Sequence, residues 1–510
     1  MENEKRETGT VVKLLILCLA VAIIVIDGTV LNVSIKEIVK DLGTDLKQIQ
    51  WAITGYSLVL AALTILGGKL GDIYGRKKMF ILGALIFGIG SLITAFATNI
   101  WMLIIGWSVV EGIGAALMVP ASSALIINNF EPKKRGMAFG VYGATAGAAS
   151  AFGPIIGGFL TSTLSWRWAF GINVFIVIAL IVGALLKVSD TSEKLKGYKL
   201  DWIGVLLSSL GLVSLSYGII EYNKEGIPFV ILGLALIIAF IAFENYLLKI
   251  GKAPLVNIKM FLNRQFTIST LIVASLFAGF SGVITFGLSL YYQSVLGLDA
   301  FGSGLGFLPF SIATLIMAPS SVKLSNRFGT KIVVISGLAV GIIANFLLYI
   351  NITSGSTLLS LSPYLFVFGL GFGAIVAQVT NLALSSVSKE EAGEASGING
   401  TVREVGRTIG IAVIGAVFLS TVISSISNNL NDKVKENAIP AVVANGIIDK
   451  ISGGDIASVT FGLKKIGSNP VIEQAIKEGL ANSSKQAILY TEIFFVMSLL
   501  CALLLPNKKN

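Results

Sequence analysis

The residues of this sequence that could move a proton are carboxylic acids placed inside long apolar runs. Asp27 interrupts the run from 12 to 35, Glu111 lies midway along 100 to 127, and Glu404 lies within 396 to 424. A carboxylate inside an apolar helix is costly unless it is paired or protonated. A proton and a cation can therefore compete for each of these acids, and such competition is the chemistry of an exchange reaction.

The three acids differ in their sequence neighbours. Asp27 has no basic residue within one helical turn, so it is the first candidate for coupling, with a neutral acid hydrogen-bonded inside a bundle as the alternative. Glu111 also lacks a basic neighbour and could bind a cation or relay a proton. Glu404 lies three residues before Arg407, on the same helix face, so a structural ion pair is the alternative to a coupling role.

Other kinds of site find little support in the sequence. There is no histidine, and Cys18 and Cys501 lie in apolar runs near opposite ends of the chain, so we expect no metal site and no disulfide. A phosphate-binding loop of the Walker type is absent as well. We therefore expect no enzyme activity and no cofactor, and a proton gradient as the driving force.

The elements that hold these acids are membrane helices. Of 510 residues, 54% are hydrophobic and 13% are charged, against about a quarter charged in a soluble domain. Apolar runs close to the ~20 residues that cross a bilayer alternate with short charged connections. The fourteen expected helices are 12 to 35, 51 to 70, 79 to 98, 100 to 127, 136 to 162, 168 to 187, 202 to 221, 228 to 248, 266 to 292, 304 to 322, 332 to 350, 362 to 386, 396 to 424 and 487 to 505.

The basic residues predict the orientation. Lys and Arg gather in alternate loops, at 76 to 78, 133 to 135, 194 to 199 and 323 to 331, and again at the C-terminus. By the positive-inside rule these loops and both termini face the cytoplasm, in a multi-pass protein of the cell membrane. Orientation thus accounts for the formal charge of +10, and no nucleic-acid partner is expected.

A repeated loop divides the chain into halves. GKLGDIYGRKK at 68 to 78 is echoed by VKLSNRFGTKI at 322 to 332, with Gly75 matching Gly329 and Lys77 matching Lys331. We expect a six-helix bundle in 1 to 190, two inserted helices in 191 to 260, and a second six-helix bundle in 261 to 510. The polar stretch 422 to 486 should be external, either with a short amphipathic helix near 470 to 480 or as a solvated spacer.

Three further sets of residues could serve transport. A loop set could latch one bundle against the other, a glycine-rich set in the fifth helix permits close packing and a bend, and aromatic side chains could line a cavity. Static anchoring, packing and interface roles are the respective alternatives. The loop set is Gly68, Gly71, Asp72, Gly75, Arg76 and Lys77; the hinge set is Gly147, Gly153, Pro154, Gly157 and Gly158; the aromatic set is Trp51, Tyr56, Trp107 and Tyr142.

These motifs resemble the major facilitator superfamily, and specifically its fourteen-helix drug/proton antiporter branch, the EmrB and QacA type. The resemblance is carried by IDGTVLNVSI at 26 to 35, QWAITGYSLVLAAL at 50 to 63, the loop set, GAASAFGPIIGG at 147 to 158, WRWAFGIN at 166 to 173 and NGTVREVGRTIG at 399 to 410. One departure lies in the fourth helix, where the usual arginine and glutamine correspond to Ser108 and Glu111.

The resemblance implies a proton-coupled multidrug efflux antiporter that exports lipophilic, often cationic, small molecules, and we expect it to act as a monomer in the lipid bilayer. An exporter of one specific compound, such as a lipid, siderophore, peptide or tetracycline-like antibiotic, is the alternative with the same fold. A receptor or assembly factor that keeps the fold without transport is the alternative from another class.

Overall fold

The structure, a computed structural model, describes residues 2–130, 132–189, 201–220, 226–252, 254–387, 392–452 and 469–506. Within these ranges the chain forms helices and no strand. Thirteen of the described helices are long and apolar enough to cross a bilayer. The span expected at 136 to 162 is not among the thirteen, but α6 (Pro132–Thr163) is helical over that stretch.

The first group of helices runs from α1 to α7. Pairs such as α1 and α6, or α3 and α5, pack along much of their length. The expected fourth helix consists of three segments, with a π-helix between two α-helices. The bounds are α1 (Glu2–Leu42), α2 (Leu46–Tyr74), α3 (Arg76–Ala95), α4 (Ile100–Leu103), η1 (Ile104–Glu111, π), α5 (Gly112–Asn129), α6 and α7 (Trp166–Lys187).

The second group begins after a short 3-10 helix, η2 (Ile258–Leu262), and also contains a π-helix. Its expected first and second helices are each divided into shorter segments. The bounds are α10 (Arg264–Gly282), η3 (Val283–Ser289, π), α11 (Leu290–Ser294), α12 (Ala300–Gly306), α13 (Leu308–Phe328), α14 (Thr330–Asn351), α15 (Leu358–Leu384), α16 (Ala392–Lys435), α17 (Ala441–Ser452) and α20 (Pro470–Leu503). We call α1 to α7 the N-terminal bundle and α10 to α20 the C-terminal bundle.

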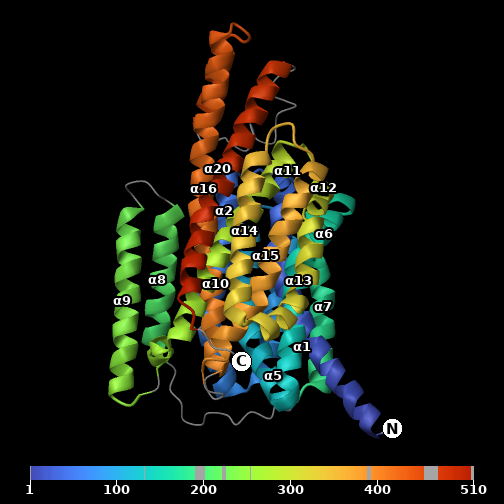
Figure 1. Ribbon diagram of the computed structural model, residues 1–510, viewed down its shortest axis with the longest axis vertical. Coiled ribbons are helices and arrows are strands. Elements are labelled where there is room, and N and C mark those ends of the chain that lie inside the picture. The colour runs from blue at the N-terminus through green and yellow to red at the C-terminus, as the bar shows by residue number, and fades with distance from the viewer. Residues whose placement is uncertain are drawn as a thin grey trace.

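The two helices between the bundles, α8 (Trp202–Ile220) and α9 (Ile227–Lys249), form a hairpin beside them (Figure 1). The hairpin contacts the rest of the protein through α8, which packs on α2 and α16. On α9, Ile231, Ile238 and other large apolar side chains are exposed. Such a surface suits contact with lipid.

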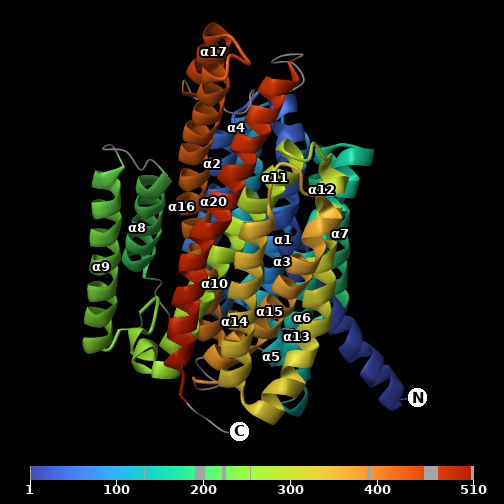
Figure 2. The same ribbon diagram turned by 45° about the horizontal axis from the view of Figure 1, so that its top comes forward.

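The start of α1 and the end of α20 lie at the same end of the molecule, which we call the inner end (Figure 1). At the opposite, outer end, α16, α17 and α20 project beyond the other helices (Figure 2). Ile426, Leu430, Ile476 and Leu480 are buried between α16 and α20 there. Of the two alternatives for 470 to 480, a short amphipathic helix or a solvated spacer, the structure shows a helix. It is not a separate short helix but the first part of α20, because its apolar face continues into that of the membrane helix.

The repeated loop has the same geometry in both halves. Gly75 links α2 to α3 at φ +107°, and Gly329 links α13 to α14 at φ +89°. Only glycine adopts such angles without strain. Lys77 Nζ donates to Leu185 O at 3.0 Å, and Lys331 Nζ donates to Leu505 O at 2.7 Å. In each half a lysine thus binds a carbonyl at, or just beyond, the C-terminal end of the last helix of its bundle, where the helix dipole favours a cation.

Candidate functional site

The carboxylate of Asp27 is buried in the N-terminal bundle between two donors. Its exposed fraction is 1%. Trp107 Nε1, from η1, donates to Oδ2 at 2.7 Å, and Asn173 Nδ2, from α7, donates to Oδ1 at 3.0 Å. Both contacts join residues that are distant in the sequence. Two donors stabilise an ionised carboxylate, so this site can hold Asp27 without its proton.

Glu111 lies beside Asp27 and is fully buried. Thr94 Oγ1 donates to Glu111 Oε1 at 3.4 Å, whereas Oε2 has no N–H or hydroxyl donor. The carboxyl groups of Glu111 and Asp27 are close enough to interact electrostatically. Two buried carboxylates repel each other, and a proton on either acid removes that repulsion. The pair can therefore hold one proton between two acids.

The π-helix η1 and two glycines make room for Glu111. A Cβ at position 90 would lie 2.5 Å from Glu111 Cγ and 2.6 Å from Gly106 O, so α3 can approach η1 only with glycine there. Ser108, at the position of the family's arginine, donates to Ala52 O at 2.7 Å on α2. The fourth helix thus presents no basic group to Asp27, and π-helical segments of this kind often mark functional sites.

A central cavity lies between the two bundles. Its free volume is about 100 Å³, below the roughly 300 to 1,000 Å³ of sites for drug-sized ligands. The bundles must therefore separate before a ligand of that size can bind. The wall comprises Ile24, Val25, Thr29, Asn32, Tyr56, Leu60, Ala146, Phe277, Phe280, Ser281, Ile284, Thr285, Phe372, Val376, Arg403, Glu404 and Arg407.

The charged groups of this wall form an Arg–Glu–Arg cluster on α16. Arg403 Nε lies 3.1 Å from Glu404 Oε1, and Arg407 Nη1 lies 3.8 Å from Glu404 Oε2. The expected pairing of Glu404 with Arg407 is confirmed, and Arg403 is an additional partner. Arg407 also donates to the Gly28 carbonyl of α1. Arg407 thus joins the C-terminal bundle to the residue that follows Asp27.

Of the four aromatic residues expected in the cavity, the structure places only Tyr56 on its wall. Trp107 lies behind Tyr56, stacked on it at 4.9 Å, because its indole binds Asp27. Trp51 packs on Tyr217 of α8, and the Tyr142 hydroxyl lies 2.6 Å from Ser122 Oγ within the N-terminal bundle. The other aromatic residues of the wall are Phe277, Phe280 and Phe372 of the C-terminal bundle. The sequence motifs did not indicate these three residues.

Asp27 and Glu111 are not on the cavity wall. They lie behind Tyr56 and Trp107, whereas Glu404 faces the cavity directly. A direct contact between Asp27 and a bound cation therefore requires these rings to move. The coupling roles expected for the three acids stay predictions.

The loop set anchors its own bundle at the inner end. Arg76 Nη1 donates to Ala124 O of α5 at 3.4 Å, as Lys77 does to α7. Gly71 lies against Arg76, and Gly68 against Pro120 of α5. The side chain of Asp72 is outside the described part of the structure. An ion pair of Lys69 Nζ with Glu394 Oε2, at 3.8 Å, crosses between the bundles; the sequence did not single it out.

The hinge set of α6 packs on both bundles near the outer end. A Cβ at Gly157 would lie 3.0 Å from Val30 Cα, and Gly153 faces Thr29, so both glycines let α6 approach α1. Gly158 packs against the backbone of Ala300 in α12, and Gly304 of α12 packs against the Pro154 carbonyl. Gly147 lies in the same helix. Phe301 N also donates to Ser162 Oγ at 2.9 Å, so the bundles are closely joined at this end.

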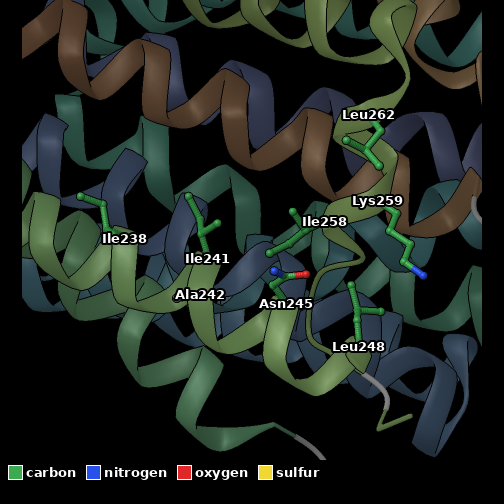
Figure 3. Close-up of a pocket in the computed structure, with 8 residues that line it drawn as sticks. All are labelled: Ile238, Ile241, Ala242, Asn245, Leu248, Ile258, Lys259 and Leu262. Atoms are coloured by element: carbon green, nitrogen blue, oxygen red, sulfur yellow. The ribbon is translucent and has the colours of Figure 1, made fainter. Parts of the chain in front are cut away.

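A second hollow lies outside the bundles, between α9 and η2 (Figure 3). Its wall is apolar except for Asn245 and Lys259. It belongs to the helix hairpin and is remote from the acids, so it is a surface feature and not part of the central site. Among the described residues no group of three potential metal ligands occurs.

Comparison with known proteins agrees with this architecture. The family model described as Major Facilitator Superfamily matches residues 17–411. A Streptomyces coelicolor protein named "Probable actinorhodin transporter" is 34% identical over 80% of this chain and 72% of its own length. The multidrug transporter protein MdtP of Bacillus subtilis is 28% identical over 97% of this chain and 93% of its own length. The methylenomycin A resistance protein of the same species is 30% identical over 82% of this chain and 89% of its own length.

Solved structures show the same fold. An inward-facing bacterial homologue of the human lysosomal transporter Spinster superposes with a TM-score of 0.62 at 16% identity, covering 98% of this chain and 97% of that one. The family match spans both bundles, and several relatives cover more than two thirds of the chain at 30% identity or more. The chain therefore belongs to the Major Facilitator Superfamily and is a membrane transporter.

Proposed function

We propose that this protein exports lipophilic small molecules of the antibiotic and drug type in exchange for protons. The observation that carries the proposal is the buried Asp27–Glu111 pair, which can hold a proton close to the cavity. Gly28, the residue after Asp27, accepts a hydrogen bond from Arg407, which lines the cavity. Relatives named for antibiotic resistance and multidrug transport support the export of such compounds. The expectation that the substrates are often cationic stays a prediction.

Arg407 connects the acids to the cavity. With the cavity open to the inner side the pair loses its proton, and the ionised carboxylate attracts Arg407, which lines the cavity and donates to Gly28 O. A proton that enters from the outer side neutralises the pair and weakens this attraction. Arg407 can then shift toward Glu404, 3.8 Å away, which changes the cavity wall and favours release.

The protein acts in the cell membrane, with the inner end and both termini in the cytoplasm, because the basic connections between α2 and α3 and between α13 and α14 lie at that end. It acts as a monomer, uses the proton gradient, and needs no cofactor. The partners are the small-molecule substrate, protons and the lipid bilayer.

The test is proton release from acid-loaded vesicles, with the inner end facing outward, on addition of a lipophilic substrate such as ethidium or puromycin. We expect release from the native protein, and at least tenfold less from Asp27→Asn and from Glu111→Gln. Asp449→Asn, an exposed acid of α17, is the matched control and should retain full release. Release that is equal in all four proteins would contradict coupling through the pair.

Export of one specific compound is a second candidate. Relatives that are named for a single antibiotic, such as the methylenomycin A resistance protein, support it. Growth of cells that express the protein on a panel of unrelated drugs separates the candidates. Resistance to one chemical class alone favours the specific exporter.

A further inference from the structure

The central cavity has a wall of unusual composition for a site that receives cations. Two guanidinium groups, Arg403 and Arg407, face it together with a single carboxylate, Glu404. These are the charged side chains of the described cavity wall, and they leave one positive charge in excess. The other polar groups of the wall are the neutral Thr29, Asn32, Ser281 and Thr285.

The aromatic part of the wall belongs mainly to the C-terminal bundle. Phe280 and Phe372 stack at 4.3 Å with 22° between their planes, and Phe277 meets Phe372 edge-on at 6.0 Å. Tyr56 lines the opposite side, from α2. A planar ring system fits between such walls because offset stacking and edge contacts favour aromatic partners.

The position that a cationic ligand would take over these rings is already occupied. The guanidinium carbon of Arg403 lies 5.8 Å from the centre of the Phe277 ring. A cationic ligand would have to displace this cation–π contact and face two arginines for one carboxylate. The cavity wall therefore disfavours a permanent cation.

An anion is disfavoured for a different reason, which rests on the proposed function. Neutralising the Asp27–Glu111 pair removes a negative charge near Arg407. Binding of an anion to Arg407 would then become stronger in the protonated state, which is the state that must release substrate in a proton antiporter. A neutral ligand avoids this conflict.

We propose that the preferred substrates are uncharged, planar aromatic molecules that carry carbonyl or phenol oxygens. Once the bundles have separated, the ring system packs between Phe277, Phe280 and Phe372 on one side and Tyr56 on the other. The oxygens accept hydrogen bonds from Arg403, Arg407 and the neutral polar groups, and a phenol can donate to Glu404. This recognition makes use of donors on the wall and needs no ligand charge.

The test uses four probes of nearly equal size: hydroxymethyl-anthraquinone, its carboxylate analogue, its trimethylammonium analogue, and hydroxymethyl-anthracene, which lacks the ring carbonyls. Equilibrium dialysis with the purified protein in detergent gives their affinities without any proton gradient. We expect the neutral quinone to bind at least tenfold more tightly than the cation or the anthracene, and more tightly than the carboxylate.

Two variants test whether the preference for the neutral quinone depends on side chains of the cavity wall. Arg403→Gln should weaken the quinone about tenfold and leave the anthracene unchanged, because a hydrogen bond to a charged donor is lost. Phe280→Leu should weaken both. Arg327→Gln, an exposed arginine 5.2 Å from the Phe328 ring, is the matched control and should change neither.

The inference would be overturned if the cation or the carboxylate bound as tightly as the neutral quinone or more tightly. It would also be overturned if quinone and anthracene bound equally, or if Arg403→Gln left the quinone affinity unchanged. Failure of the proposed proton coupling is seen separately, as absent proton release from vesicles when the neutral quinone itself is added. The binding preference can thus fail while coupling holds, and coupling can fail while the preference holds.

Discussion

At the scale of single residues, the ionisation of Asp27 depends on donors from two other helices, η1 and α7. Trp107 has two roles in this site, because its N–H binds the carboxylate and its ring supports Tyr56, which lines the cavity. The two roles can be separated by substitution, since phenylalanine keeps an aromatic ring and has no donor.

Trp107→Phe should reduce proton release on substrate addition about tenfold, because the ionised form of Asp27 loses a charge-assisted hydrogen bond. Substrate affinity should change little, since Tyr56 keeps an aromatic neighbour. Vesicle proton release and equilibrium binding measure the two effects. Trp101→Phe, at a 65% exposed position of α4, is the control, and a parallel loss there would refute the assignment.

Some residues of the site could be predicted from the sequence, and others could not. Asp27 and Glu404 were identifiable because a carboxylate in an apolar run is costly, and the Glu404–Arg407 pair followed from helical spacing. Asn173, which donates to Asp27 from α7, gave no such signal, because an amide in an apolar helix need not be functional. Phe280 and Phe372 look like ordinary packing residues until the bundles are assembled.

At the scale of elements, the position of Glu111 depends on a break in regular helix geometry. The apolar run from 100 to 127 correctly predicted a membrane-spanning helix, but its change to a π-helix over Ile104–Glu111 depends on the close approach of α3 and could not be predicted from periodicity. Gly75 and Gly329 of the repeated loop were predictable, because the requirement for glycine there is local: their backbone angles demand it whatever packs nearby.

Gly90→Ala should push Glu111 and η1 away from α3. A Cβ there would lie within 2.6 Å of Glu111 N and Gly106 O, a contact that rigid backbone cannot avoid. We expect a loss of about 1 to 3 kcal/mol in unfolding free energy and a larger fractional loss of transport. Gly341→Ala, within α14, meets no atom within 4 Å and should be neutral in thermal unfolding and transport. Equal behaviour of the two variants would exclude a steric role for Gly90.

At the scale of the whole molecule, the bundles meet through different contacts at the two ends. The outer end is joined by close backbone packing of α6 on α12, which tolerates no added side-chain atoms at Gly158 or Gly304. The inner contact includes the ion pair of Lys69 with Glu394, whose side chains are 16% and 20% exposed. A partly exposed ion pair can break and reform more easily than a packed backbone contact, so the inner end is the easier one to open.

Lys69→Glu should separate the inner ends, because two carboxylates would then face each other, and Lys69→Glu combined with Glu394→Lys should restore the native spacing. Probes attached at the inner ends of α3 and α14 report this distance in electron spin resonance. Transport should fall in the single variant and recover in the double variant. A double variant no better than the single one would show that the two side chains are not coupled.

The long helices of the outer end give the C-terminal bundle a rigid arm. α16 has 44 residues and is therefore about 66 Å long at 1.5 Å per residue, more than twice the ~30 Å of the hydrocarbon layer. It is braced by α20 through Asn429 Nδ2, which donates to Ala475 O at 3.1 Å, and by Asn482 Nδ2, which donates to Ser425 Oγ at 3.0 Å. A small rotation of the bundle within the bilayer is thus magnified at the tip of α16, where an antibody fragment could hold the transporter in one conformation from outside the membrane.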